Sequence, residues 1–399
     1  MNGKITIMAP LGNVVFNQDL IKRLTILKRS GISSISTDLW WSHFEPRKGV
    51  YDWSIAKEWI RVLKITGLKW VPIISLHECG GNVNDNFTIN LPKYIQDEYI
   101  STESSFMVDN GIEVQEYVSF WNERIYERYR LLLCSFYNTF KNEINMISKL
   151  YVSMGPAGEL RYPSYSPLFG WKYPEPGTLT CYSKHARESF HRYLENKYLT
   201  IETMNSEWGT HYMVWQDVHP PQHCASFFSQ FFYTSNYGRD LLSWHQNILH
   251  RHFSKLASIS NRCFGGKIRL GVKLSGVHWK FHQGRLAEKA TGYVDESYFK
   301  LVRLIKKYDF DLTITCLEME TNQESGIDSI LHNIKKACKV YGVKLYGENA
   351  LPVYPGDKKA WANIQRNIEG IDGFTYLRWD IVFSDREILS CLKSLITTK

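Results

Sequence analysis

The 399-residue chain contains no long hydrophobic run. No segment approaches the roughly 20 apolar residues that a membrane helix needs, and the N-terminal residues lead directly into a strand-like stretch instead of a signal-peptide core. We therefore expect no membrane partner and no leader in this sequence. The protein is then either cytoplasmic or secreted with its leader already removed.

Motifs for phosphate-bearing cofactors and for a nucleophilic serine are also missing. The chain has no GxGxxG turn, no phosphate-binding loop and no GxSxG elbow, which argues against a nucleotide cofactor and a serine hydrolase. None of the eight cysteines forms a CxxC pair, and His77 and His278 lack a third ligand at a spacing typical of zinc sites. We predict no cofactor and no metal. A chain of this length needs no disulfides, so we expect mostly reduced cysteines, as in a cytosolic protein.

The excess of positive charge is small. The chain has 48 Lys and Arg against 40 Asp and Glu, and the basic residues occur in short pairs such as Lys22-Arg23 and Lys335-Lys336. Nucleic-acid-binding proteins instead gather such residues in a stripe or patch on one face. The pairs fit solvated helix faces, and we predict no nucleic-acid partner.

Aromatic side chains, in contrast, are abundant, with 13 Trp, 24 Tyr and 20 Phe. In such numbers they often line sites for carbohydrates or nucleobases, whose flat faces stack on aromatic rings. A hydrophobic share of 44% is enough to bury a large core. No linker, repeat or low-complexity tract divides the sequence, so we expect residues 1–399 to form a single domain.

Eight short apolar runs alternate with segments of helical periodicity. The predicted strands are, in chain order, Lys4–Ala9, Ile32–Leu39, Trp70–His77, Leu150–Met154, Lys267–Leu274, Asp311–Cys316, Lys344–Tyr346 and Phe374–Leu377. Such alternation is typical of parallel strands with helical crossovers, closed as a (β/α)8 TIM barrel. An open doubly wound sheet is the alternative, but it would place a glycine-rich phosphate turn after an early strand, and none is present.

Two connections are much too long for simple strand-to-helix turns. One runs from His77 to about Glu116, and the other runs from Glu159 to about Gly266 with helical periodicity over Ser183–Lys197 and Gly238–Ser258. Both leave the carboxyl ends of their strands, where a barrel of this kind holds its active site. We expect these excursions, after strands three and four, to form a cap that deepens a pocket.

Polar side chains follow nearly every predicted strand. The candidates at the mouth of the barrel are Asp38, His77, Asp85, Glu159, Lys273, His278, Thr315, Glu318, Glu348, Asn349 and Arg378. Carboxylates dominate this set. Glu159 lies in the turn-rich stretch Gly155–Tyr165 after the fourth strand, and Glu348 ends the seventh strand, nearly opposite in an eight-stranded ring.

Two carboxylates in an aromatic setting are typical of glycoside hydrolysis. One must hold a proton near neutral pH, which apolar surroundings favour, and the other must stay ionised, which a nearby cation favours. Lys273, on the fifth strand, could hold one of the two ionised, although the sequence does not say which. For either glutamate alone, a structural ion pair is an equally good interpretation. Both together, at opposite strand ends, favour a catalytic pair.

Five segments of the chain resemble the β-amylase family. They are His77–Asp85, Gly155–Tyr165, Ser275–Trp279, Thr315–Met319 and Gly347–Leu351. The similarity runs from about Met8 to the last predicted helix, near Asp385–Leu395. It implies a (β/α)8 barrel that removes maltose units from the non-reducing ends of α-1,4-glucans and releases β-maltose with inversion.

The resemblance also implies roles for individual residues. Glu159 would be the general acid and Glu348 the general base that activates water, with the two carboxyl groups roughly 6.5–9.5 Å apart. Residues 80–86 match a mobile lid that closes through Asp85, and residues 315–319 match an inner loop. The matching sugar-contacting or pocket-lining positions are Asp38, His77, Asp85, Arg161, Lys273, His278, Trp279, Thr315, Glu318, Asn349, Ala350, Leu351 and Arg378.

The chain departs from the family pattern at several places. Glu78 stands where the lid motif usually has Gln, and Asn84 where it usually has Gly, so we expect a more charged and stiffer lid. The segment Tyr117–Ile125 matches poorly. The loop Glu45–Val50 lacks the acidic residues of the calcium site of some bacterial members, and we predict no structural calcium. We expect no starch-binding module after the barrel, and therefore poor action on granular starch.

Three functions remain open on the sequence alone. They are an active exo-acting β-amylase, a catalytically silent glucan-binding protein and an exo-hydrolase for another oligosaccharide. The presence of both glutamates and of nearly every sugar-contacting position favours the first, with an α-1,4-glucan or malto-oligosaccharide as the partner. We expect a monomer. Cys316, in the inner loop, is either a residue through which thiol reagents inhibit the protein or an inert buried cysteine.

Overall fold

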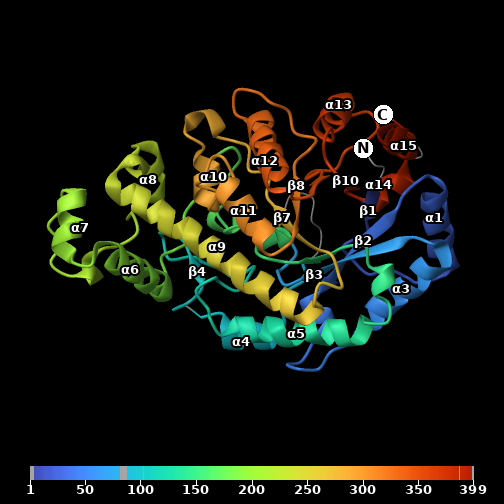
Figure 1. Cartoon of the computed structure of the whole chain (residues 1–399), viewed down its shortest axis with the longest axis horizontal. Coiled ribbons are helices and arrows are strands. Elements are labelled where there is room, and N and C mark those ends of the chain that lie inside the picture. The colour runs from blue at the N-terminus through green and yellow to red at the C-terminus, as the bar shows by residue number, and fades with distance from the viewer. Residues whose placement is uncertain (1–3, 81–87, 102, 386, 398–399) are drawn as a thin grey trace.

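A computed structural model describes residues 4–80, 88–101, 103–385 and 387–397 of the chain. Eight parallel strands form a closed barrel in the order β1-β10-β9-β8-β7-β6-β3-β2, with helices around it (Figure 1). These strands are β1 (Ile5–Met8), β2 (Ser34–Trp40), β3 (Lys69–Ser75), β6 (Leu150–Val152), β7 (Leu270–Leu274), β8 (Asp311–Thr315), β9 (Leu345–Glu348) and β10 (Gly373–Tyr376). Each overlaps one of the eight predicted strands, so the predicted TIM barrel is confirmed.

Helices fill the connections between the strands. They are α1 (Gln18–Arg29), α2 (Trp41–Phe44), α3 (Ser54–Thr66), α4 (Lys93–Tyr99), α5 (Ile125–Phe140), α6 (Lys184–Tyr198), α7 (Ile201–Trp208), α8 (Cys224–Ser229), α9 (Asn236–Phe264), α10 (Leu286–Thr291), α11 (Phe299–Lys307), α12 (Ile327–Tyr341), α13 (Lys358–Asn367), α14 (Trp379–Ser384) and α15 (Glu387–Thr397). None of these described helices is long and apolar enough to span a bilayer.

The first helix shows how local sequence sets an element. The Asn17 side chain accepts a hydrogen bond from the Leu20 backbone N–H at 3.0 Å and so satisfies a donor that the first turn leaves free. Leu20, Leu24 and Leu27 recur at helical spacing, and all three are buried. Helix α1 therefore presents one apolar face to the core, where it packs near α3.

Alternation along the strands separates two environments. On β2, Ile35 and Leu39 belong to the main hydrophobic core that includes the outer helices. The neighbouring position Asp38 faces the barrel interior, where Ser75 donates to its Oδ1 at 2.8 Å. A small apolar cluster also fills the interior, made by Met8, Val71, Ile73 and Tyr151. This cluster forms the floor below the polar residues at the carboxyl ends of the strands.

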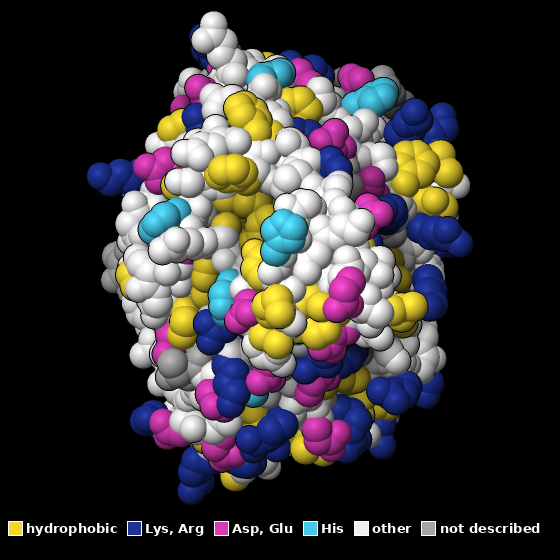
Figure 2. Space-filling model, turned by 90° about the vertical axis from the view of Figure 1, so that its left-hand side faces the viewer, with side chains coloured by type: hydrophobic (Ala, Val, Ile, Leu, Met, Phe, Trp, Pro, Cys, Tyr) yellow, Lys and Arg dark blue, Asp and Glu magenta, His cyan; other side chains and the backbone are white. Residues whose placement is uncertain are grey.

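The two long excursions leave the barrel where the sequence predicts them. The first contains α4 and a short antiparallel pair, β4 (Phe106–Met107) and β5 (Glu113–Val114). The second contains α6, α7 and α8, which lie at one end of the molecule, and the long helix α9 leads from there back to the barrel (Figure 1). On that end Lys and Arg are interspersed with Asp and Glu (Figure 2).

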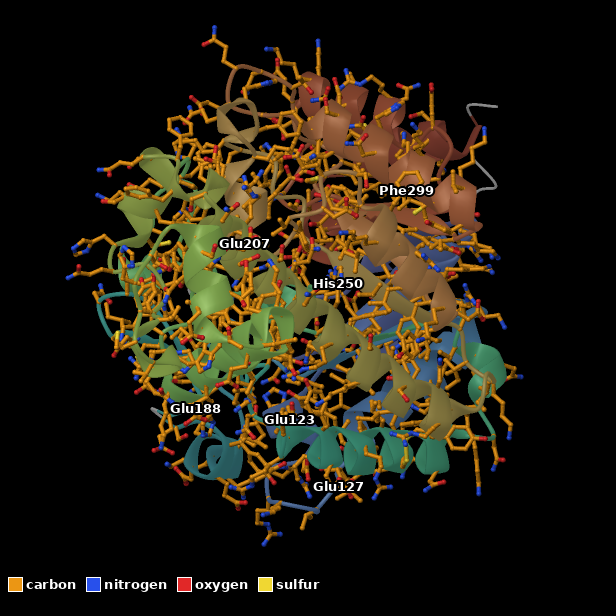
Figure 3. The ribbon with its side chains drawn as sticks, turned by 60° about the vertical axis from the view of Figure 1, so that its left-hand side comes forward. Glu123, Glu127, Glu188, Glu207, His250 and Phe299 are labelled. Carbon is orange, nitrogen blue, oxygen red and sulfur yellow. A yellow bond between two sulfur atoms is a disulfide. The ribbon has the colours of Figure 1, made fainter. Side chains whose placement is uncertain are left out.

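Helices α5 and α9 pack against each other and are joined covalently. Figure 3 shows α9, on which His250 lies, crossing above α5 next to Glu123. Cys134 of α5 and Cys263 of α9 form a disulfide across this contact. The expectation of reduced cysteines is therefore wrong for this pair. The two residues lie 129 positions apart, and only the packing of the two helices brings them together.

Candidate active site

The two predicted carboxylates both lie at the carboxyl end of the barrel. Glu159 follows a single-turn 3-10 helix, η2 (Pro156–Gly158), and Glu348 is the last residue of β9. The turn before Glu159 requires glycine at position 155, because a Cβ there would lie 2.5 Å from the Glu159 carbonyl oxygen. Both side chains are buried, with exposed fractions of 8% for Glu159 and 5% for Glu348.

Glu159 is held by two donors. Arg161 Nε donates to its Oε2 at 2.9 Å, and the Thr315 hydroxyl donates to its Oε1 at 2.8 Å. The Arg161 guanidinium lies 4.3 Å from the centroid of the Tyr165 ring, which fixes it from the other side. Both oxygens of Glu159 are thus positioned by side chains that the sequence analysis assigns to the site.

Glu348 has a different environment. Lys273 Nζ donates to both of its oxygens, at 3.0 and 2.7 Å. Burial raises the pKa of the Glu348 carboxyl, and the charge and hydrogen bonds of Lys273 oppose this rise. The question left open by the sequence is therefore answered, because Lys273 contacts Glu348 and favours its ionised form.

Asp38 and His77 occupy the adjacent side of the site, at the ends of β2 and β3. His77 Nδ1 lies 2.8 Å from the Ser153 hydroxyl, and the imidazole meets the Trp40 ring edge-to-face at 5.4 Å. Burial, together with the charges of Lys273 and Arg161, lowers the pKa of His77 to about 3. The imidazole is therefore neutral near pH 7, so it can offer one nitrogen as an acceptor or one N–H as a donor to a hydroxyl group.

His278 and Trp279 follow β7 on the opposite side of the mouth. His278 Nδ1 lies 2.9 Å from the Ser325 hydroxyl, and burial lowers the pKa of this histidine to about 4. The Trp279 indole packs with the rings of Tyr165 and Trp171, at centroid distances of 5.1 and 5.7 Å. The site thus has an aromatic wall of the kind expected for sugar binding.

The inner loop contacts the carboxylate of Glu159 and the backbone of Glu348. Thr315 reaches Glu159, whereas the backbone N–H groups of Cys316 and Leu317 donate to the Glu348 carbonyl oxygen at 2.9 and 3.1 Å. Glu318 accepts from the backbone N–H groups of two residues after β9, Ala350 at 2.9 Å and Leu351 at 2.6 Å. Burial raises the pKa of Glu318 to about 7.

Residues after β9 and β10 complete the site. The Asn349 amide donates to the carbonyl oxygens of Leu351 and Leu377, each at 2.8 Å, which fixes the turn that exposes Leu351. Leu351 is 49% exposed although its side chain is apolar. The Arg378 Nη1 atom is buried and has no hydrogen-bond partner among the described residues.

The structure brings together all but one of the predicted site residues. The exception is Asp85, which lies outside the described residues, as do Asn84 and most of the predicted lid. Glu78 is described, and burial raises the pKa of its carboxyl. The poorly matching segment Tyr117–Ile125 packs against residues that follow β6. The Tyr117 hydroxyl donates to the Ser153 carbonyl oxygen at 3.2 Å, and Phe120 packs on the ring of Tyr162 at 5.0 Å.

Some residues around the site were missed by sequence reasoning. The Tyr151 hydroxyl lies 2.6 Å from the Thr313 hydroxyl inside the barrel, below Lys273. The Glu116 carboxyl is near Arg161 and Glu78, and burial raises its pKa. Inward-facing strand positions could have indicated Tyr151 and Thr313, since alternate residues share one face. Nothing in the sequence distinguishes Glu116.

Metal ligands were sought in the described part of the chain. No three His, Cys, Asp or Glu side chains gather there in a way that could hold an ion. In the loop compared with the calcium site, the buried carboxylate of Glu45 accepts from the Trp41 indole N–H, the Gly49 backbone N–H and the Arg128 guanidinium. An internal cation therefore neutralises this carboxylate.

Comparison with known proteins agrees with this geometry. The chain is 34% identical to a thermophilic β-amylase of Thermoanaerobacterium thermosulfurigenes, over 98% of this chain and 73% of that protein. It is 36% identical to a β-amylase of Niallia circulans, over 96% of this chain and 68% of that protein. The catalytic domain of a Paenibacillus polymyxa β-amylase superposes with a TM-score of 0.88 at 35% identity, covering 94% of this chain and 92% of that domain. Residues 6–393 match the sequence profile of glycosyl hydrolase family 14. The chain belongs to this family of glycoside hydrolases.

Proposed function

We propose that this protein is a β-amylase, which hydrolyses α-1,4-glucosidic bonds from the non-reducing ends of starch-type glucans and releases β-maltose. The observation that supports this best is the unequal pair of buried carboxyls, with Glu159 bound by Arg161 and Thr315 and Glu348 bound by Lys273. An inverting glycosidase needs such a pair, one group to donate a proton and one to accept it.

Glu159 acts as the general acid in this proposal. A protonated Glu159 transfers its proton to the glycosidic oxygen as the bond to the anomeric carbon breaks, so that the remaining glucan leaves as a neutral alcohol. The hydrogen bonds from Arg161 and Thr315 then stabilise the carboxylate that results. These donors also fix the position of both oxygens before the reaction.

Glu348 acts as the general base. Its ionised carboxylate takes a proton from a water molecule on the opposite face of the sugar ring, and the resulting hydroxide equivalent attacks the anomeric carbon with inversion. Burial raises the pKa of Glu348, and the contacts with Lys273 oppose this rise and favour the ionised form. The pair regains its starting state when a proton passes from Glu348 back to Glu159 through solvent.

The surrounding residues bind the glucan. In this proposal Asp38, His77 and Arg378 bind the non-reducing sugars, and the Trp279 wall and Leu351 contact the chain beyond the cleaved bond. Asp85, which lies outside the described residues, is assigned to sugar binding from the family resemblance alone. The remaining binding positions are Arg161, Lys273, His278, Thr315, Glu318, Asn349 and Ala350. A single catalytic domain, acting as a monomer on soluble glucans without a metal or cofactor, is part of the proposal.

Product analysis tests the proposal directly. The purified protein is incubated with soluble starch and with maltoheptaose, and the released sugars are separated by chromatography while polarimetry follows their anomeric form. We expect maltose as the main product, initially as the β anomer, and a loss of at least about 10³-fold in kcat for Glu159→Gln and for Glu348→Gln. A wild-type protein that binds maltoheptaose and releases nothing is a silent glucan-binding protein, and glucose or long dextrins as main products indicate another exo-hydrolase.

A further inference from the structure

The inner loop, residues 315–319, contains a residue in an unfavourable backbone conformation. Cys316 has a φ of 100°, in a region that residues with a Cβ seldom adopt because it is sterically strained. Such a conformation persists only when the surrounding structure holds it from several sides. The contacts around this loop therefore decide whether Thr315, the residue before Cys316, reaches Glu159.

The end of β9 holds the N–H groups of the loop. Those of Cys316 and Leu317 both donate to the Glu348 carbonyl oxygen, at 2.9 and 3.1 Å. The Glu318 carboxylate in turn accepts from the backbone N–H groups of Ala350 and Leu351. These bonds connect the inner loop to the segment that contains Glu348.

Two asparagines of helix α13 hold the carbonyl groups of the loop. The Asn367 amide donates to the Leu317 carbonyl oxygen at 2.9 Å, and the Asn363 amide donates to the Glu318 carbonyl oxygen at 3.0 Å. The two asparagines are four positions apart, so they share one face of the helix, and their exposed fractions are only 4% and 7%. Removal of either amide would leave its carbonyl partner buried and unpaired, which is unfavourable.

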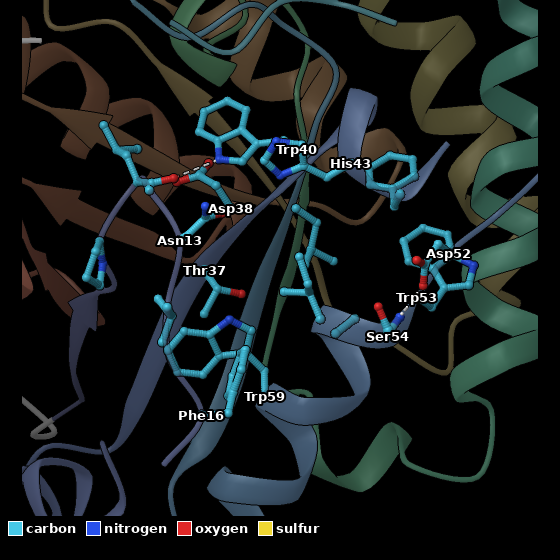
Figure 4. Close-up of a pocket in the computed structure, with 18 residues that line it drawn as sticks. Asn13, Phe16, Thr37, Asp38, Trp40, His43, Asp52, Trp53, Ser54 and Trp59 are labelled. Carbon is cyan, nitrogen blue, oxygen red and sulfur yellow. Dashed lines mark hydrogen bonds between the residues drawn. The ribbon is translucent and has the colours of Figure 1, made fainter. Parts of the chain in front are cut away.

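The loop after β1, at the same end of the barrel, is packed less tightly. Figure 4 shows a cleft with a volume of about 180 Å³ between this loop, the end of β2 and the start of α3. The Trp40 indole N–H donates there to the Leu11 carbonyl oxygen at 3.0 Å, and a Cβ at Gly12 would meet nothing within 4 Å. At the inner loop, in contrast, a Cβ at Gly276 would lie 1.9 Å from the Cys316 Sγ atom.

We propose that Asn363 and Asn367 are positioning residues for the general acid. They hold the inner loop in the strained conformation in which the Thr315 hydroxyl donates to the Oε1 atom of Glu159 at 2.8 Å. Because α13 follows β9, the segment that contains the proposed base also fixes the position of the proposed acid. The effect on Glu159 rests on the proposed function, whereas the hold on the loop does not.

Thiol labelling tests the hold on the loop without an activity assay. Leucine resembles asparagine in shape but has no donor, so the double variant Asn363→Leu, Asn367→Leu removes both hydrogen bonds. The loss of two hydrogen bonds should increase the population of an opened loop at least about tenfold. We therefore expect iodoacetamide to label Cys316 at least about ten times faster than in the wild type, as measured by mass spectrometry. Cys181, which is buried in the excursion after β6, is the reference and keeps its labelling rate.

Combined variants test the action through Thr315. Misplacement of a catalytic group by about 1 Å can cost about 100-fold in rate, so we expect the double variant to lower kcat on maltoheptaose by about 10–100-fold. Added to Thr315→Val, it should lower kcat no further than Thr315→Val alone, because both changes remove the same contact.

Asn205→Leu is the matched control. The Asn205 amide also donates to a backbone carbonyl oxygen, that of Tyr212 at 2.8 Å, but it lies on the distant helix α7 (Figure 1). Its replacement is expected to leave kcat and the labelling rate of Cys316 at their wild-type values. Circular dichroism and thermal unfolding establish that each variant is folded before the comparison.

The outcomes separate this inference from the proposed function. A wild-type labelling rate of Cys316 in the folded double variant, or equal acceleration at Cys316 and Cys181, overturns the hold on the loop even if the wild type releases maltose. Losses in kcat that multiply with that of Thr315→Val overturn the action through Thr315. A wild type that releases no maltose refutes the proposed function, and faster labelling of Cys316 in the variant then still supports the hold on the loop. If the double variant does not fold, the single variants Asn363→Leu and Asn367→Leu decide by the same measurements.

Discussion

Lys273 provides the sharpest test of the catalytic assignment, because it contacts only one of the two carboxylates. Its ammonium group donates to both oxygens of Glu348, at 3.0 and 2.7 Å, in a site where both side chains are buried. Replacement by methionine keeps the length of the side chain and removes the charge. The variant Lys273→Met therefore leaves the Glu348 carboxyl buried without its cation.

The size of the effect follows from the two hydrogen bonds. Hydrogen bonds to a charged group contribute about 1.5–3 kcal/mol each, so the loss of both disfavours the ionised form of Glu348 by at least about 3 kcal/mol and raises its pKa. Burial already raises this pKa, and Lys273 is the first cause that opposes the rise. A general base must be ionised, so the limb of the pH profile on which activity increases with pH moves to higher pH, by at least about two pH units at about 1.36 kcal/mol per unit.

The measurement is kcat/KM for soluble starch as a function of pH, because this ratio reports the pKa values of the free enzyme. Lys149→Met is the matched control. Lys149 is also buried, but it pairs with Asp311 at 3.0 Å at the amino end of the barrel, and its loss is expected to reduce stability and leave the pH profile unchanged. A folded Lys273→Met protein with the wild-type acid limb would refute the assignment of Glu348 as the base that Lys273 keeps ionised.

Three further predictions concern stability and reactivity. Replacing the bridged cysteines by Cys134→Ser and Cys263→Ser opens a loop of 129 residues. The gain in chain entropy of the unfolded state is expected to lower the free energy of unfolding by up to about 5 kcal/mol, as measured by urea unfolding. An unchanged urea midpoint would contradict a disulfide in solution. Glu45→Gln leaves the buried Arg128 without its partner and is expected to cost about 3–5 kcal/mol, whereas a calcium chelator should not change the melting temperature of the wild type. Burial raises the pKa of the Cys316 thiol, so iodoacetamide should inactivate the enzyme slowly at neutral pH and more rapidly at higher pH. Cys316→Ser should abolish this inactivation. Inactivation that persists in Cys316→Ser excludes this residue as the target.

The strand pattern of the sequence was sufficient to predict the barrel. Short apolar runs alternating with amphipathic helices leave few ways to bury both faces of a parallel sheet, and the closed barrel is the one observed. The positions of Glu159 and Glu348 were predictable for the same reason, since the carboxyl end of each strand opens on the same face. The disulfide between Cys134 and Cys263 was not, because it depends on how α5 and α9 pack and not on any local pattern.

The partners of the two carboxylates required the three-dimensional structure. Glu159 follows β6 and Glu348 ends β9, whereas their donors Thr315 and Lys273 end β8 and lie on β7. Each donor thus reaches past one intervening strand, Thr315 from β8 to the end of β6 and Lys273 from β7 to the end of β9. In a barrel, inward-facing side chains of alternate strands lie in the same layer, so contact between next-but-one strands is the expected geometry. A sequence shows which residues face inward, but the shear of the closed barrel decides which layer each side chain shares. Each carboxylate therefore has a cation of its own, Lys273 for Glu348 and Arg161 for Glu159, and Glu159 also accepts from the Thr315 hydroxyl. The division of the pair into a base and an acid rests on the match to glycosyl hydrolase family 14, and the pH profile of Lys273→Met tests it.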